Sequence, residues 1–279
     1  MGVGVRRSRI INSRIRDTRS LLESMVTLAR KNELPFLAGG IAFFAFFSLI
    51  PTLILVVTVG SFLGGEQFAM RAVALVEAFL SEEGSAVITE ALSDQSGAAT
   101  ASIVGVLALL WSTLKVFRAV DVAFDRIYGA EAVVSFARRM VNAAVVLVSI
   151  GSGLMLLFTL QLAITRLLPD SATYASLIGA PVLLLALLIV LTPLYYVMPP
   201  VPVGLREIVP GTLVATVGLT VLQQVFHVYA SLAGEFELYG FIGAVLLFLL
   251  WLYFGSLVLL FGTVVNVALA EHRGAVDPR

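Results

Sequence analysis

The chain has 279 residues and a mass of 29.8 kDa, with 59% apolar residues, 13% charged residues and a mean hydropathy of +1.00. Soluble domains carry about 25% charged residues, so this composition excludes an ordinary water-soluble enzyme and predicts an integral membrane protein. Basic and acidic residues both total 18, which leaves no net charge to attract nucleic acid. Cysteine is absent, which excludes disulfides, thiolate metal sites and cysteine nucleophiles.

The first expected element is an amphipathic helix over residues 15–31, inside an N-terminal segment of residues 1–34. Apolar side chains alternate there with Arg16, Arg19, Arg30 and Lys31. This pattern is typical of a helix that lies at the membrane interface with its cations near anionic headgroups. A cytoplasmic helix packed against the bundle is the alternative.

Six apolar runs then predict an all-α membrane bundle of six transmembrane helices within residues 35–270. The expected spans are 37–63, 99–117, 140–165, 176–198, 209–230 and 241–270. An acidic outer loop at about 64–98 is expected to form one or two short helices, and residues 271–279 are expected to form a tail.

Prolines mark two kinks and one turn in this bundle. Pro51 and Pro193 fall inside the first and fourth spans, and each removes a backbone donor. Four further prolines predict a rigid turn between the fourth and fifth spans: Pro199, Pro200, Pro202 and Pro210.

Basic residues determine the predicted orientation. With the N-terminus inside, sixteen lysines and arginines lie on the cytoplasmic side, and only Arg71 and Arg166 lie outside. The positive-inside rule therefore predicts a multi-pass protein of the plasma (inner) membrane with both termini in the cytoplasm.

Polar side chains inside the fifth span are the main candidate site. Within an arc of about 80° and over about 22 Å of axis, one helix face carries a polar stripe. Its members are Thr212, Thr216, Thr220, Gln223 and His227, with Gln224 and Tyr229 beside it. The stripe indicates either the wall of a substrate passage or a packing face held by interhelical hydrogen bonds.

Other candidates lie on the first and last spans. Ser48 stands beside the expected Pro51 kink, where a broken helix can present polar groups to a substrate; a bent helix that only packs against its neighbours is the alternative. Asn266 lies on a broad face of the last span with Gly255, Ser256, Gly262 and Thr263, which is typical of a close-packing surface. Aromatic residues near the span ends are expected to anchor the helices at the interface, with stacking against a ligand as the alternative: Trp111, Tyr195, Tyr196, Trp251 and Tyr253.

Three stretches together resemble the YihY/BrkB family of six-span membrane proteins. They are the aromatic-rich segment Leu37–Pro51, the segment from Leu110 to Arg139 that includes Phe124-Asp-Arg-Ile-Tyr-Gly129, and the segment from Leu194 through Gly211 and Gly262 to Asn266. The resemblance implies an inner-membrane protein for which transport has been suspected and which has inherited a ribonuclease label. The chain departs from the family pattern at Val264, where a Glu is usual, and at Asp125, where an Asn is frequent.

The residues themselves argue against catalysis. Metal-dependent RNA cleavage needs clustered histidines and carboxylates, whereas the chain has two histidines and no such cluster; no Gly-x-Ser-x-Gly elbow is present either. We therefore expect no enzyme activity, catalytic residue, cofactor, metal or nucleic-acid partner. The leading hypothesis is a transporter or lipid-translocating protein for a small neutral, zwitterionic or lipid-like substrate. The alternative is a structural or partner-binding envelope protein, and the oligomeric state is left open.

Overall fold

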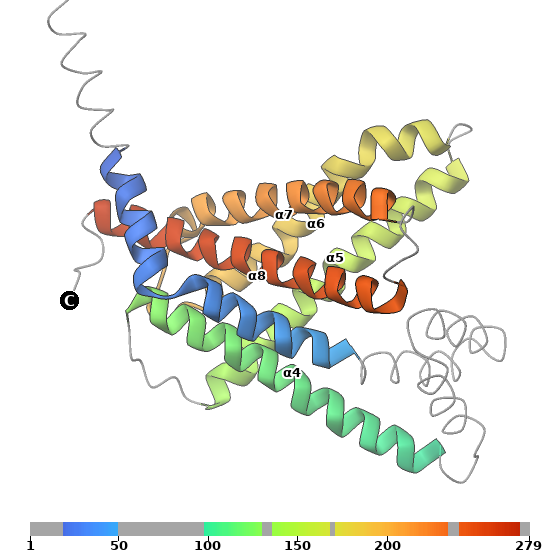
Figure 1. Ribbon diagram of the computed structural model, residues 1–279, viewed down its shortest axis with the longest axis horizontal. Coiled ribbons are helices and arrows are strands. Elements are labelled where there is room, and N and C mark those ends of the chain that lie inside the picture. Colours follow the sequence, from blue (N-terminus) through green and yellow to red (C-terminus); the bar gives the residue numbers. More distant parts are fainter. Residues whose placement is uncertain (1–18, 50–97, 130–135, 168–170, 234–239, 274–279) are drawn as a thin grey trace, which may run out of the picture. The chain divides into compact units, whose positions relative to one another are not determined.

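Helices form the architecture of this chain in a computed structural model that describes residues 19–49, 98–129, 136–167, 171–233 and 240–273 (Figure 1). Its labelled helices are α4 (Ala98–Tyr128), α5 (Phe136–Leu167), α6 (Ser171–Val197), α7 (Leu205–Ala233) and α8 (Gly240–His272). Two further helices, Arg19–Lys31 and Leu34–Leu49, precede them. No strand occurs in these ranges, as the all-α prediction requires.

The two N-terminal helices meet at a sharp bend of 56°. Pro35 cannot continue the preceding helix but is tolerated in the first turn of the next one, so the chain turns at Asn32 and Glu33. Glu33 adopts a left-handed φ of 51°, and its carboxylate lies 3.8 Å from the Arg126 guanidinium of α4. Together the two helices are apolar enough to form one bent span.

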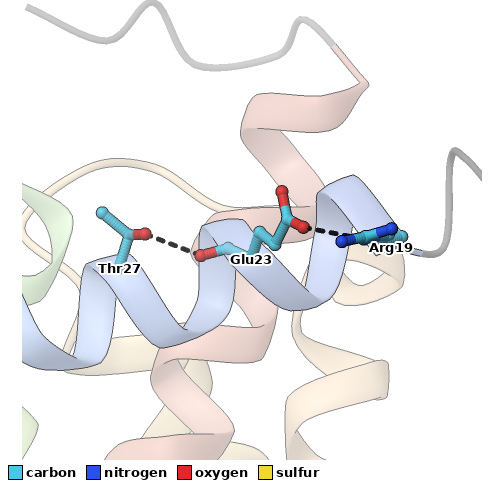
Figure 2. A network of polar contacts seen from close by, with 3 residues as sticks. All are labelled: Arg19, Glu23 and Thr27. Carbon is cyan, nitrogen blue, oxygen red and sulfur yellow. Dashed lines mark hydrogen bonds and ion pairs between the residues drawn. The ribbon is translucent and has the colours of Figure 1, made fainter.

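The helix Arg19–Lys31 carries a short polar network along one side (Figure 2). Arg19 Nε donates to Glu23 at 3.0 Å, and the Thr27 hydroxyl donates to the Glu23 carbonyl oxygen at 2.7 Å. The helix ends at Lys31 as expected, residues 15–18 of the expected helix lie outside the described residues, and its position at the membrane interface stays a prediction.

The helix α4 is longer than the expected span over 99–117. It continues to Tyr128 because Val120, Ala123, Phe124 and Ile127 repeat at helical spacing and are buried. This final part of α4 is therefore a packed amphipathic segment, which the search for purely apolar runs missed.

The helices α5 and α6 pack as an antiparallel pair. A Cβ on Gly153 would lie 2.6 Å from Val190 and 3.3 Å from the Ala186 carbonyl oxygen, so the two backbones come close at this point. Nearer the other end, Asn142 Nδ2 donates at 2.7 Å to the carbonyl oxygen of Val197. This bond satisfies a carbonyl that the end of α6 leaves without an intrahelical partner.

The helix α7 begins earlier than expected, and Pro210 lies inside it rather than in the preceding turn. Gly204 caps the helix: its carbonyl accepts from Glu207 and Ile208, and its own N–H donates to Glu207 Oε2 at 3.0 Å. This reciprocal cap resembles a capping box and fixes the helix start at Leu205. The prolines of residues 199–202 form the turn, as expected.

Three described helices are long and apolar enough to cross a membrane: Met140–Leu160, Leu205–Tyr229 and Val245–His272. The bent N-terminal pair makes a fourth candidate, and Pro181–Val197 is a shorter apolar helix. Residues 50–63 of the expected first span, with Pro51, and residues 64–97 of the expected outer loop lie outside the described residues.

The chain divides into two compact units. The first contains Met1–Leu37, Asp121–Val225 and Leu257–Arg279, and the second contains Ala38–Val120 and Phe226–Ser256. Within the second unit, Trp251 stacks against Phe248 with ring centroids 5.8 Å apart, and Phe46 and Phe226 extend this aromatic cluster. The candidate site lies mainly in the first unit.

Candidate functional site

The backbones of α7 and α8 touch where Gly211 crosses Gly262. A Cβ on Gly211 would collide with the Gly262 carbonyl oxygen, and one on Gly262 would lie 2.7 Å from the Gly211 carbonyl oxygen. Glycine at both positions removes these collisions, so the helices approach as closely as their backbones permit. The close packing expected at Gly262 is therefore confirmed.

Asn266 links the two helices beside this crossing. Its Oδ1 accepts a hydrogen bond of 2.6 Å from the Gly211 backbone N–H, and the side chain is only 2% exposed. Its Nδ2 is buried and has no hydrogen-bond partner among the described residues. Asn266 therefore holds α7 with one atom and keeps a buried donor unused on the other.

Tyr195 of α6 contacts α8 close to the crossing of Gly211 and Gly262. Its ring is fully buried next to Phe124, and its hydroxyl donates to the Leu259 carbonyl oxygen of α8 at 2.5 Å. The Tyr195 hydroxyl also lies directly against the position that a Gly262 Cβ would occupy. The expected interface anchoring is thus wrong for Tyr195, which is a core residue, whereas Tyr196 is half exposed.

The polar stripe of α7 begins in this packed region. Thr212 is buried, and its hydroxyl donates to the Ile208 carbonyl oxygen of its own helix at 2.8 Å. The Thr220 hydroxyl likewise donates to the backbone carbonyl oxygen of Thr216 at 2.8 Å. The Thr216 hydroxyl, in a side chain 1% exposed, has no hydrogen-bond partner in the described part of the chain.

The remaining predicted site residues are less buried. Along α7, Gln223 is half-buried, whereas Gln224, His227 and Tyr229 are exposed. Ser48 is half-buried, and its hydroxyl donates at 2.7 Å to the Ala45 carbonyl oxygen of its own helix. Of the predicted site residues, Asn266 thus lies at the α7–α8 crossing. The polar stripe lies along α7 and passes from buried residues to exposed ones.

A second polar group lies where α4 ends near the start of α7, and sequence reasoning did not find it. Burial raises the pKa of Tyr128 to about 12, and the nearby Glu207 carboxylate acts in the same direction. Asp121, two helical turns before Tyr128 in α4, is also buried. The helical spacing of the apolar residues around them was the available signal, because it places α4 beyond residue 117 against the bundle.

Among the described residues, no three histidine, cysteine or carboxylate side chains are grouped so that they could hold a metal ion. The site offers hydroxyl and amide groups, which form hydrogen bonds with neutral or zwitterionic molecules and with water.

Comparison with known proteins places these features in a family. Residues 25–279 match the family model described as Virulence factor BrkB. The chain is 27% identical over 266 residues to YfkH of Bacillus subtilis, which bears a ribonuclease-like name, covering 85% of this chain and 90% of that protein. It is 26% identical over 277 residues to a UPF0761 membrane protein of Alteromonas mediterranea, covering 91% and 88%. No solved structure matches the chain.

The family model spans the crossing of α7 and α8 and nearly the whole sequence, so the chain belongs to the BrkB family of membrane proteins.

Proposed function

We propose that this protein is a transporter or lipid-translocating protein of the plasma membrane, with both termini in the cytoplasm. Its passage runs along the face of α7 that carries Thr216, Thr220, Gln223 and His227. The observation that carries the proposal is the buried, unused hydrogen-bonding capacity of Thr216 Oγ1 and Asn266 Nδ2.

Unused capacity of this kind is costly in a membrane helix bundle. A buried polar atom without a partner costs about 1–3 kcal/mol, so it is retained where it has a use. A solute or water that reaches Thr216 and Asn266 would recover that cost. Gln223 lies two turns along α7 from Thr216 and is half-buried, which suits a path that continues toward the other end of the helix.

The chemistry of the spans supports an uncharged or zwitterionic substrate. Met140–Leu160 contains no Asp, Glu, Lys or Arg, and those of Leu205–Tyr229 and Val245–His272 lie at the ends, at Arg206, Glu207 and Glu271. An unscreened ion would find no opposite charge along these helices. Threonine hydroxyls and glutamine amides instead recognise hydroxyl, amide and headgroup atoms.

The ribonuclease-like name of one relative does not extend to the mechanism proposed here. RNA binding would need a basic groove with stacking aromatics, and cleavage would need grouped metal ligands. The distribution of the basic residues is instead the positive-inside pattern expected for the proposed orientation.

A structural or partner-binding role is the second candidate, and the dense α7–α8 crossing favours it. Thr212 and Thr220 direct their hydroxyls to their own helix, which is also how threonine behaves in a packing seam. In that role Gln223 would contribute to stability alone.

A ligand screen on the purified full-length protein tests the proposal. Neutral and zwitterionic metabolites, osmolytes and lysolipids are added separately, and the melting temperature is recorded, since a molecule that binds only the folded state raises it. Substitution Q223L should abolish the shift produced by the active compound, and should abolish its flux into vesicles, while the protein stays folded.

The control is V225L, an exposed position on the same helix that lies outside the stripe. It should retain both the shift and the flux. If no compound raises the melting temperature, or if Q223L lowers stability without affecting any bound compound, the structural role is correct and the transport proposal is wrong.

A further inference from the structure

The face of α7 opposite the buried residues carries a regular row of exposed side chains. Val214 is 39% exposed, Val217 is 53% exposed and Val221 is 55% exposed, and Gln224 is exposed as well. Their spacing of three, four and three residues is the a and d spacing of a heptad, along which two helices pack knobs into holes. We call Val214, Val217, Val221 and Gln224 the valine seam.

Gln224 is the residue of the valine seam that lipid cannot satisfy. Hydrocarbon chains cover valine well, but they neither donate nor accept hydrogen bonds, so an amide facing them loses its partners. Gln224 lies in the second half of the apolar segment Leu205–Tyr229, about 10 Å along the axis from its middle. The amide of Gln224 therefore needs a hydrogen-bonding partner at the same depth in the membrane.

We propose that the valine seam is a homodimer interface in which α7 packs against α7 of a second copy. Copies that insert with the same orientation carry Gln224 at the same depth, so a two-fold axis along the membrane normal brings the two amides together. Each amide has a donor and an acceptor, and the pair is therefore self-complementary. One polar residue in a β-branched seam also fixes the register of the two helices.

The valine seam adjoins one edge of the polar stripe. At 100° per residue, Val217 and Val221 lie more than a quarter-turn of the helix from Thr216 and Gln223, whereas Gln224 lies only about 40° from Thr220. Dimerisation through the valine seam therefore leaves Thr216 and Gln223 outside the interface, and the inference does not depend on the protein transporting a solute.

The absence of cysteine makes a disulfide test direct. Single substitutions V217C and V221C are placed on the valine seam, and V148C, on an exposed face of α5, is the matched control. Full-length proteins are oxidised in native membranes. Because a disulfide needs Cα atoms closer than about 7 Å, only a seam of two facing helices gives efficient cross-linking.

The proposal predicts a covalent dimer at twice the mass of the chain for V217C or V221C and little product for V148C. Adding Q224L to either cysteine variant should weaken the association constant of the dimer about five- to thirtyfold, and so lower the yield of covalent dimer when the protein density is not saturating. Adding Q224N, which keeps the amide, should retain most of the covalent dimer. Q224L removes a polar group from an exposed face, so a melting curve of the purified variant checks that it folds.

Three results would overturn the homodimer. They are equal cross-linking at V148C and V221C, an adduct with a mass other than twice that of the chain, and a yield that Q224L leaves unchanged in a folded protein.

Discussion

Asn266 of α8 accepts a 2.6 Å hydrogen bond from the backbone N–H of Gly211, one residue after a proline inside α7. The two residues are 55 positions apart in the sequence, and their contact sets the register of the α7–α8 crossing. The contact combines a close backbone approach, a buried polar link and a donor left unused, and each of these can be altered separately.

The close approach of Gly211 and Gly262 predicts that adding a single methyl group there lowers the stability of the protein strongly. G211A should destabilise the protein by more than about 3 kcal/mol or prevent folding, because its Cβ would meet the Gly262 carbonyl oxygen, which is backbone and cannot move aside. G151A is the control: nothing lies within 4 Å of its Cβ, so alanine should be neutral or slightly stabilising in α5. Melting temperatures in one detergent compare them, and similar values would contradict a tight crossing.

Loss of the Asn266 acceptor should be costly in a different way. In N266A the buried Gly211 N–H has no acceptor from α8, which should lower stability by about 1–3 kcal/mol. S152A, which removes an exposed hydroxyl bonded to its own helix, should change stability little. Unfolding of the purified proteins measures both, and a neutral N266A would show that the link between the helices is dispensable.

The bend between the N-terminal helices predicts a stabilising substitution. Glu33 holds a left-handed φ of 51°, which costs a residue with a Cβ about 1 kcal/mol relative to glycine. E33G should therefore raise stability, since the ion pair that it removes is exposed on both sides and contributes less than about 1 kcal/mol. R126Q removes the same ion pair without relieving the backbone, so it should be neutral or slightly destabilising. A loss of stability in E33G equal to that in R126Q would contradict this interpretation.

Tyr128 gives the protein an alkaline sensitivity. Burial and then Glu207 raise its pKa from 10.0 to about 12, so the folded state keeps the phenol proton where the unfolded chain has lost it. The resulting stabilisation is complete below pH 10 and is lost as the pH rises toward about 12. Between about pH 8 and about pH 11, the melting temperature of Y128F should fall less than that of the unchanged protein. Equal losses would show that Tyr128 does not carry this dependence.

The positions of the long helices could be predicted from the sequence because an apolar run needs no knowledge of its neighbours. The expected spans 140–165, 176–198, 209–230 and 241–270 each fall within a few residues of α5, α6, α7 and α8. The errors occur where another force determines the structure. Phe124 and Ile127 extend α4 through packing, and the cap at Gly204 starts α7 before Pro210.

The candidate site was predictable only in part for the same reason. The stripe on α7 follows from helical periodicity alone, and Gly262 and Asn266 share one face of the last span by the same argument. Which of these polar atoms pair depends on the register between α7 and α8, set by Gly211 opposite Gly262. Tyr195 is the clearest example of what periodicity does not reveal. Its place near a span end predicts a residue that anchors the helix at the membrane interface, whereas packing against Phe124 buries it.

The central claim is that the face of α7 with Thr220 and Gln223 lines a path open to water. Single substitutions T220C, Q223C, V217C and V221C in this cysteine-free chain, each exposed in membranes to a charged thiol reagent that cannot enter lipid, test it most directly. The claim predicts that the reagent modifies T220C and Q223C and leaves V217C and V221C unmodified. Protection of all four positions, or equal modification of all four, would contradict it.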